Sequence, residues 1–171
     1  MLDRFMPDKS VKRVTELDPQ TLKSLGVEAV IYDVDDTLVS HRTAAPDEKL
    51  KEYLFSVRDA GIDVALVSNN GPERVETFDR DLGFFFTAKA KKPKKSALLP
   101  SLEHFKRDPA KVAFVGDQLL TDCLCAKRNG IRFFFVEPID RYENPFFVVK
   151  RALEKPLLLI YRRRLRRKSQ K

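Results

Sequence analysis

The stretch EAVIYDVDDTLV, residues 28–39, decides how the rest of the sequence is interpreted. Its first part is a short apolar run after Gly26, a pattern typical of a buried strand over residues 28–34. Two carboxylates, Asp33 and Asp35, stand two positions apart where this strand ends. In an α/β sheet the ligand lies beyond the carboxyl ends of the strands, so these residues are the first candidates for a functional site.

The sequence after this strand predicts alternating helices and strands. Apolar residues at helical spacing predict helices over residues 47–60, 72–82, 96–105 and 119–129. Short apolar runs predict strands over residues 62–67, 84–87, 112–115 and 131–136. This alternation predicts βαβ units and a mostly parallel sheet.

Polar residues gather at two further predicted strand ends. Ser68, Asn69 and Asn70 follow one strand, and Gly116 and Asp117 end another. The loop after residues 84–87 carries three lysines, Lys89, Lys91 and Lys92, any of which could enter the site. Because the carboxyl ends of parallel strands share one edge of the sheet, the sequence predicts a single site with carboxylates, a hydroxyl and a lysine.

Four segments resemble, in order, the motifs of the haloacid dehalogenase superfamily. They are VIYDVDDTLV at residues 30–39, Ser68 in LVSNN, Lys92 in KKP, and GDQLLTD at residues 116–122. The resemblance implies a single three-layer α/β/α domain over residues 1–171, with a five-stranded parallel sheet in the order 5-4-1-2-3. No cap domain is expected, because residues 39–46 form only a short connection.

The opening residues and all four motifs also look like the YqeG-type branch of these phosphatases, whose relatives include phosphatases of phosphatidylglycerophosphate. Asp36 departs from that branch, which usually has Asn there. The resemblance favours Lys92, which precedes a proline, as the functional lysine.

The resemblance assigns a role to each motif residue. Asp33 would be the nucleophile that forms an aspartyl-phosphate. Asp35, protonated at first, would give its proton to the leaving alcohol and later take one from water. Mg²⁺ would be held by Asp33, the backbone carbonyl of Asp35 and Asp117. Ser68 and the amide of Asn69 would bind a phosphoryl oxygen, Lys92 would add positive charge and restrain Asp33, and Thr37, Gly116 and Asp122 would support the site.

The remaining cysteines and histidines have plainer interpretations. Cys123 and Cys125 lie at i and i+2 on a predicted helix, which does not bring them to one face, so we expect buried core thiols. His41 and His104 are expected to be isolated surface residues.

The formal net charge of +8 belongs to the end of the chain. Seven of the 33 Lys and Arg residues lie between Tyr161 and Lys171, where there is no acidic residue. The first 160 residues hold the other 26 against 25 Asp and Glu. A nucleic-acid partner is therefore not expected, since such binders carry charge across the fold.

The sequence also predicts where the protein resides. Two cysteines favour a reducing compartment, and neither a secretory signal nor an apolar run long enough to span a bilayer is present. We expect a cytoplasmic protein, with peripheral attachment at the inner membrane face as a further hypothesis.

The C-terminal segment, residues 144–171, is expected to be helical with a basic tail. Asn144 and Pro145 are typical of a helix start, and Pro156 is expected to bend or split the helix. Two interpretations stay open: a helix packed on the core with a solvated basic end, or an interfacial anchor on an anionic membrane.

These expectations define the predicted function. The sequence predicts a Mg²⁺-dependent phosphomonoesterase that converts phosphatidylglycerophosphate to phosphatidylglycerol at a membrane surface. One alternative is a phosphatase of a soluble phosphorylated metabolite, and another is a non-catalytic assembly factor that docks on RNA or membrane. The usual glycine-rich nucleotide-binding motifs are absent.

Overall fold

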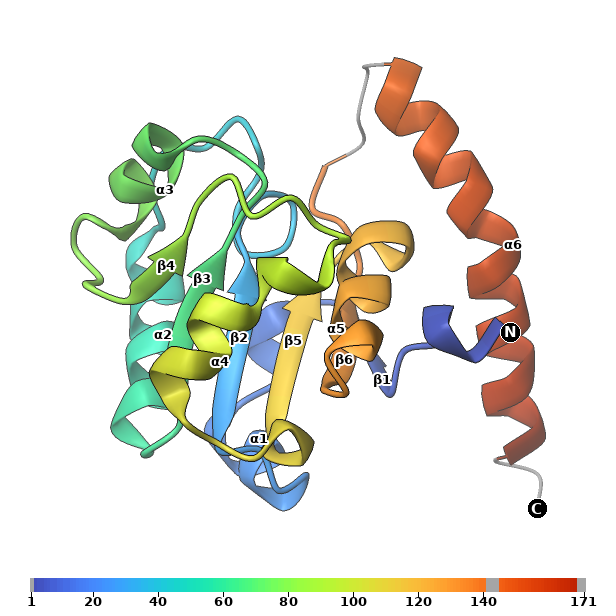
Figure 1. The fold of residues 1–171 in the computed structure, drawn as a ribbon, viewed down its shortest axis with the longest axis horizontal. Helices are drawn as coiled ribbons and strands as arrows, with labels where there is room; N and C mark the ends of the chain where they lie inside the picture. The colour runs from blue at the N-terminus through green and yellow to red at the C-terminus, as the bar shows by residue number, and fades with distance from the viewer. Residues whose placement is uncertain (1, 141–144, 169–171) are drawn as a thin grey trace.

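A six-stranded, fully parallel sheet forms the centre of the computed structural model, which describes residues 2–140 and 145–168 (Figure 1). The strand order is β1-β6-β5-β2-β3-β4. The strands are β1 (Lys9–Val11), β2 (Ala29–Asp33), β3 (Asp63–Val67), β4 (Phe85–Thr87), β5 (Val112–Gly116) and β6 (Arg132–Val136). Central strands β2 and β5 are buried throughout, as expected for a sheet covered on both faces.

Helices cover both faces of this sheet, which gives the predicted three layers. One core cluster joins the sheet to α1 (Pro19–Ser24), α2 (Glu48–Asp59) and α3 (Pro72–Asp79). The other joins it to α4 (Leu99–Phe105) and α5 (Leu124–Arg128), which lie in front of the sheet in Figure 1. Short helical turns complete the chain: η1 (Leu2–Phe5), η2 (Val14–Glu16), η3 (Lys95–Ala97), η4 (Pro109–Lys111) and η5 (Leu119–Cys123).

The five predicted strands are confirmed in their predicted order, as β6-β5-β2-β3-β4. The number of strands is corrected to six, because β1 pairs with the outer edge of β6. This strand has only three residues and a single buried side chain, Val11, so its pattern is too short to predict a strand. Asp8 fixes its start: the Asp8 amide donates to the Phe133 carbonyl at 2.8 Å, and the Phe133 amide donates to the Asp8 carboxylate at 2.7 Å.

The segment predicted as one helix over residues 119–129 has two parts. Its first turn, η5, is a π-helix that carries Asp122, and α5 continues from it. Single π-helical turns are frequent at functional sites, because the extra residue redirects side chains that an α-helix would distribute differently.

The C-terminal helix α6 (Pro145–Lys168) runs without interruption along the edge of the molecule (Figure 1). The expectation that Pro156 would split it is wrong, and Asn144 lies outside the described residues. Contacts on one side hold the helix: Glu154 and Tyr161 are buried, and Leu157 packs against the second core cluster. Among the described residues, no helix combines the length and apolar character needed to cross a membrane.

Candidate active site

Three buried carboxylates meet at the carboxyl edge of the sheet. Asp33 ends β2, Asp117 follows β5, and Asp122 lies on η5. One ligand atom from each lies within 4.8 Å of the others, and Asp117 and Asp122 are fully buried. The structure thus brings together residues that the sequence separates by more than eighty positions.

The Lys92 ammonium group lies between two of these carboxylates. Its Nζ donates to Asp33 Oδ1 at 2.6 Å and forms an ion pair with Asp122 Oδ1 at 2.9 Å. Lys92 is buried, whereas Lys89 and Lys91 are exposed, so Lys92 is the lysine that enters this cluster. Burial alone would lower the pKa of Lys92, but the carboxylates of Asp122 and Asp33 hold it above its usual range.

The excess of negative charge is also reflected at Asp33. Burial raises the pKa of Asp33 well above its usual range, Lys92 opposes this effect, and Asp122 and Asp117 add to it. Three carboxylates against one ammonium group leave two negative charges in excess when all are ionised. Buried charges are stable only when paired or bound to a metal, so this donor set fits a divalent cation.

Asn69 sets the position of the lysine loop. Its side chain accepts from the Lys92 amide at 2.8 Å and donates to the Lys92 carbonyl at 3.3 Å. The loop is also held by Lys89, whose amide donates to the Asn70 carbonyl at 2.7 Å, and by Ala90, whose amide donates to the Ser68 carbonyl at 3.0 Å. These contacts fix the loop between β4 and η3, so that the Lys92 side chain reaches inward.

Asp35 is surrounded by donors from the loop after β3 and from α3. Its Oδ2 accepts from Asn70 Nδ2 at 2.8 Å and from Ser68 Oγ at 3.3 Å. Its Oδ1 accepts from Arg74 Nε at 3.1 Å and Nη2 at 2.9 Å. Sequence reasoning placed Asn70 at this strand end but gave it no role, and it missed Arg74 as a site residue. One signal was available: a positive side chain in the first turn of a helix is electrostatically unfavourable unless it pairs with an acid.

Gly116 and Thr37 have close neighbours in the fourth motif. A Cβ at Gly116 would lie 2.6 Å from Asp122 Oδ2 and 2.8 Å from Asp122 Cβ, so only glycine leaves room for this carboxylate. Asp122 Oδ2 also accepts from the Gln118 amide at 3.1 Å. Thr37 Oγ1 lies 3.4 Å from Asp117 Oδ1, close enough for a long hydrogen bond.

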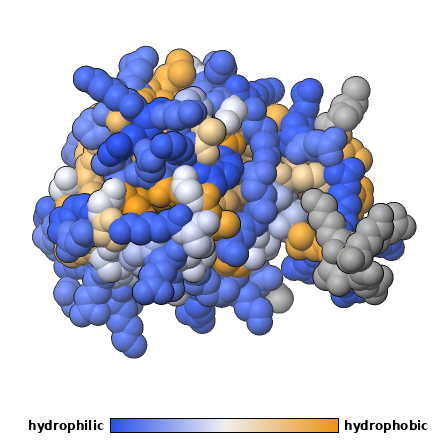
Figure 2. Space-filling model, turned by 90° about the horizontal axis from the view of Figure 1, so that it is seen from below, coloured by the Kyte–Doolittle hydropathy of each residue, from blue (hydrophilic) through white to orange (hydrophobic). Residues whose placement is uncertain are grey.

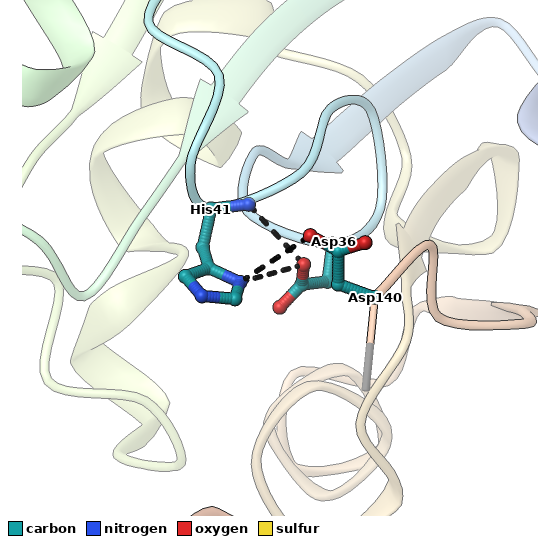
Figure 3. Close-up of side chains that lie close together, drawn as sticks. All are labelled: Asp36, His41 and Asp140. Carbon is teal, nitrogen blue, oxygen red and sulfur yellow. Dashed lines mark hydrogen bonds and ion pairs between the residues drawn. The ribbon is translucent and has the colours of Figure 1, made fainter. Parts of the chain in front are cut away.

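His41 belongs to a second cluster beside the first motif (Figure 3). Its Nδ1 lies 3.1 Å from Asp36 Oδ1 and 4.0 Å from Asp140 Oδ2, and its amide donates to Asp36 Oδ1 at 3.2 Å. The expectation of an isolated His41 is therefore wrong. Asp36 is buried with φ of 61°, a left-handed conformation that Asp and Asn tolerate better than most residues.

His104 lies at the surface, whereas the two cysteines lie in the core. His104 is exposed as expected, but its ring stacks on Phe85 with centroids 4.3 Å apart, so it is not isolated. Cys123 and Cys125 are free and fully buried, which confirms the expectation of core thiols.

An open groove adjoins the site on the α2 side. Its volume is about 580 Å³, and Thr37 and Leu38 of the first motif line one wall. Residues 12–15 and 136–139 also line the groove, as do Asp47, Lys49 and Leu50 at the start of α2. The chain between β2 and α2 is only a loop, and the chain between β3 and β4 adds only α3. Between β2 and β4, all within the described residues, no segment is long enough to form a cap domain.

Comparisons with known proteins agree with this arrangement. The profile of the haloacid dehalogenase-like hydrolases matches residues 6–130, most of the chain. The chain belongs to this family. A relative within the family is the probable phosphatase YqeG of Bacillus subtilis, 32% identical over 94% of this chain and 93% of that protein. Together these matches identify the chain as a phosphatase of the family, a phosphoric monoester hydrolase.

Two less similar proteins match this chain over part of their own length. The chloroplastic and mitochondrial phosphatidylglycerophosphate phosphatase 1 of Arabidopsis thaliana is 29% identical over 90% of this chain, which spans about half (47%) of that protein. Among solved structures, the cobalt-bound deoxy-D-mannose-octulosonate 8-phosphate phosphatase of Haemophilus influenzae superposes with a TM-score of 0.54. The two sequences are 20% identical, and the superposition covers 74% of this chain and 75% of that protein, a likeness that shows the fold.

Proposed function

We propose that this phosphatase cleaves phosphate monoesters through a phosphorylated Asp33 and takes phosphatidylglycerophosphate as its substrate. The observation that carries the reaction is the buried cluster in which Lys92 Nζ contacts Asp33 at 2.6 Å beside Asp117 and Asp122. An attacking carboxylate must be fixed and its neighbours must neutralise the phosphoryl oxygens, and this cluster offers both.

The reaction has two steps. An oxygen of Asp33 forms a bond to phosphorus while the bond from phosphorus to the leaving alcohol oxygen breaks, and a proton on Asp35 passes to that oxygen. Asp35 then takes a proton from water as the water oxygen attacks phosphorus, which releases inorganic phosphate and restores Asp33. The donors around Asp35 hold its carboxyl group 3.3 Å from Ser68 Oγ, the hydroxyl oxygen that we propose binds the phosphoryl group.

Mg²⁺ would be held by the side chains of Asp33 and Asp117 and the backbone carbonyl of Asp35, and it would neutralise charge on the phosphoryl group. Ser68 and the Asn69 amide would donate to a phosphoryl oxygen. Lys92 would bind a second oxygen while keeping Asp33 in place. Three further residues would position the side chains of this site. Asp122 orients Lys92, Gly116 leaves space for Asp122, and Thr37 orients Asp117.

Two observations support a phospholipid substrate. Relatives in Arabidopsis thaliana and Chlamydomonas reinhardtii are phosphatidylglycerophosphate phosphatases by name, although the chain spans only 47% and 57% of their length. The site has no cap, and an uncovered site admits a phosphate that stays attached to a large assembly.

The outer face of α6 supports contact with the membrane that would contain this substrate. Val149, Leu153 and Leu159 are 60%, 62% and 57% exposed, and apolar surface is visible on the α6 side, at the right of Figure 2. Four exposed arginines follow on the same helix: Arg162, Arg163, Arg164 and Arg166. Apolar side chains flanked by cations fit an anionic leaflet, where each basic residue contributes up to about 1 kcal/mol.

The reaction is tested with purified protein and a panel of phosphate monoesters that includes phosphatidylglycerophosphate and soluble metabolites. We expect phosphate release from the lipid and its loss in Asp33→Asn, because an amide cannot form the acyl-phosphate. Asp35→Asn should accumulate the phosphorylated enzyme, which is detected by its mass. Activity of Asp33→Asn within tenfold of the parent would contradict the proposed nucleophile, and a preference for soluble esters would contradict the lipid substrate.

Membrane contact is tested by sedimentation with vesicles of phosphatidylcholine and phosphatidylglycerol. The variant Leu153→Ser/Leu159→Ser removes the apolar face, whereas truncation from Tyr161 would also remove a buried side chain. Leu99→Ser, an exposed leucine on α4, is the matched control. We expect weaker binding of the double variant only, and weaker binding of the parent in high salt. Equal binding of all three proteins at both salt concentrations would exclude α6 as the membrane contact.

A further inference from the structure

Arg74 connects the candidate general acid to the open side of the site. It lies in the first turn of α3, and its guanidinium group donates to Asp35 Oδ1 through both Nε, at 3.1 Å, and Nη2, at 2.9 Å. Its Nη1 donates to the Ala44 carbonyl at 2.8 Å. Arg74 thus links α3 to the loop between β2 and α2, and it faces the carboxylate that the leaving alcohol must approach.

The guanidinium group has more donors than these contacts use. It carries five N–H groups, and the contacts with Asp35 and Ala44 occupy one on each nitrogen. The second N–H of each terminal nitrogen has no partner among the described residues. The side chain is 20% exposed, whereas that of Lys92 is 4% exposed and engaged with Asp33 and Asp122. Arg74 can therefore bind a further acceptor without giving up its present contacts.

A second cation lies close to the same helix start. Lys89 Cε lies 3.9 Å from the position that a Cβ on Gly71 would occupy, and Gly71 is the N-cap residue of α3. Lys89 is exposed, and its amide contact with Asn70 fixes the backbone beside the site. The α3 side of the site therefore carries positive charge that the phosphoryl-binding cluster does not use.

We propose that Arg74, assisted by Lys89, binds a second anionic group on the leaving alcohol, of the phosphate class. The inference rests on the proposed role of Asp35. Because Asp35 must contact the leaving oxygen and Arg74 contacts Asp35, the next part of the alcohol lies within reach of the guanidinium group. A guanidinium fork matches two phosphate oxygens, and the phosphodiester of a phosphatidylglycerophosphate headgroup is such an anion. Arg74 would then select substrates with two phosphate groups.

The test compares substrates that differ only in the second anion. Glycerol phosphate has the same kind of leaving oxygen but no second anion, glycerol bisphosphate adds a soluble phosphate, and short-chain phosphatidylglycerophosphate adds a lipid phosphodiester. The kcat/KM of each is measured for the parent, Arg74→Ala and Arg74→Lys. Arg80→Ala is the matched control, because Arg80 is an exposed arginine at the C-cap of the same helix.

Loss of Arg74 also removes two hydrogen bonds to Asp35, so activity on every substrate is expected to fall, and the informative quantity is the ratio between substrates. We expect Arg74→Ala to lower the ratio of kcat/KM for the doubly anionic substrates over glycerol phosphate by roughly 10- to 100-fold, the effect of a charged hydrogen bond. Arg74→Lys should restore part of it, and Arg80→Ala should leave it unchanged. An equal fall for all three substrates would overturn the proposal and make Arg74 a positioning residue for Asp35.

Calorimetric binding separates this inference from the proposed function. Arg74→Ala should weaken binding of glycerol bisphosphate but not of glycerol phosphate, whether or not either is hydrolysed. If it does so while the lipid is not a substrate, the anion subsite stands and the lipid assignment fails. If both ligands bind the parent and Arg74→Ala with equal affinity, the subsite is refuted.

Discussion

A single methyl group at Gly116 should disrupt the site, and the structure allows the size of the effect to be worked out. An alanine Cβ would lie 2.6 Å from Asp122 Oδ2, 2.8 Å from Asp122 Cβ and 2.9 Å from Asp122 Cγ. Rotating the carboxylate cannot relieve the contact with Cβ, so the backbone of η5 must shift. That shift weakens the bond from the Gln118 amide and the ion pair with Lys92.

The expected destabilisation is the sum of opposing effects. Overpacking a filled site costs about 1–3 kcal/mol, and weakening hydrogen bonds to a buried charge costs about 1.5–3 kcal/mol. Replacing glycine restricts the unfolded chain and returns about 0.4–1 kcal/mol. We expect Gly116→Ala to lower the free energy of unfolding by about 2–5 kcal/mol, or the melting temperature by roughly 4–20 °C for a chain of this size.

Urea and thermal unfolding measure this change, and phosphate release reports the site. Gly71→Ala is the matched control, because a Cβ there would have the flexible end of Lys89 as its nearest neighbour, at 3.9 Å, and no steric strain is expected. In the double variant Gly116→Ala/Asp122→Ala the clash with the carboxylate group is removed and only the contact at Cβ remains, so the two costs should add only in part. A stability of Gly116→Ala within about 0.5 kcal/mol of the parent, or additive costs in the double variant, would refute the reasoning.

Three further outcomes follow from the same contacts. Lys92→Met leaves the carboxylates of the cluster without their ammonium partner, so we expect the free energy of unfolding to fall by about 3–5 kcal/mol. Urea unfolding without metal measures this loss, which Mg²⁺ should partly reverse. An unchanged urea midpoint would contradict the ion-pair geometry. Activity should vanish in EDTA and return with Mg²⁺ but poorly with Ca²⁺, which prefers more ligands at longer distances, and full activity of verified metal-free protein would argue against a metal. Burial raises the pKa of Cys125 to about 12 and that of Cys123 above its usual range, so Ellman's reagent should react with both thiols only after unfolding, and rapid reaction of the folded protein would show that they are accessible.

The parts of this molecule that could be predicted from sequence are those that local pattern controls. Central strands are apolar along their whole length because both faces are covered, so β2 and β5 stand out from the flanking loops. Parallel strands then bring their carboxyl ends to one edge. This is why Asp33 and Asp117 could be assigned to one site without knowledge of any contact between them.

The features that were missed depend on partners distant in sequence. Arg74 contacts Asp35 from another element, and β1 is a strand only because β6 offers an edge to pair with. The helix around Pro156 likewise depends on distant contacts, which offset the free-energy cost of the proline. A proline inside a helix costs about 3 kcal/mol, which an isolated segment could not offset. The buried side of α6 offsets it: Glu154 is 1% exposed and accepts from the Leu120 amide at 2.9 Å, on the turn that carries Asp122. A carboxylate fixed in this way determines where the helix lies, so contacts with the turn beside the site, rather than the propensity of the segment, keep α6 continuous across its proline.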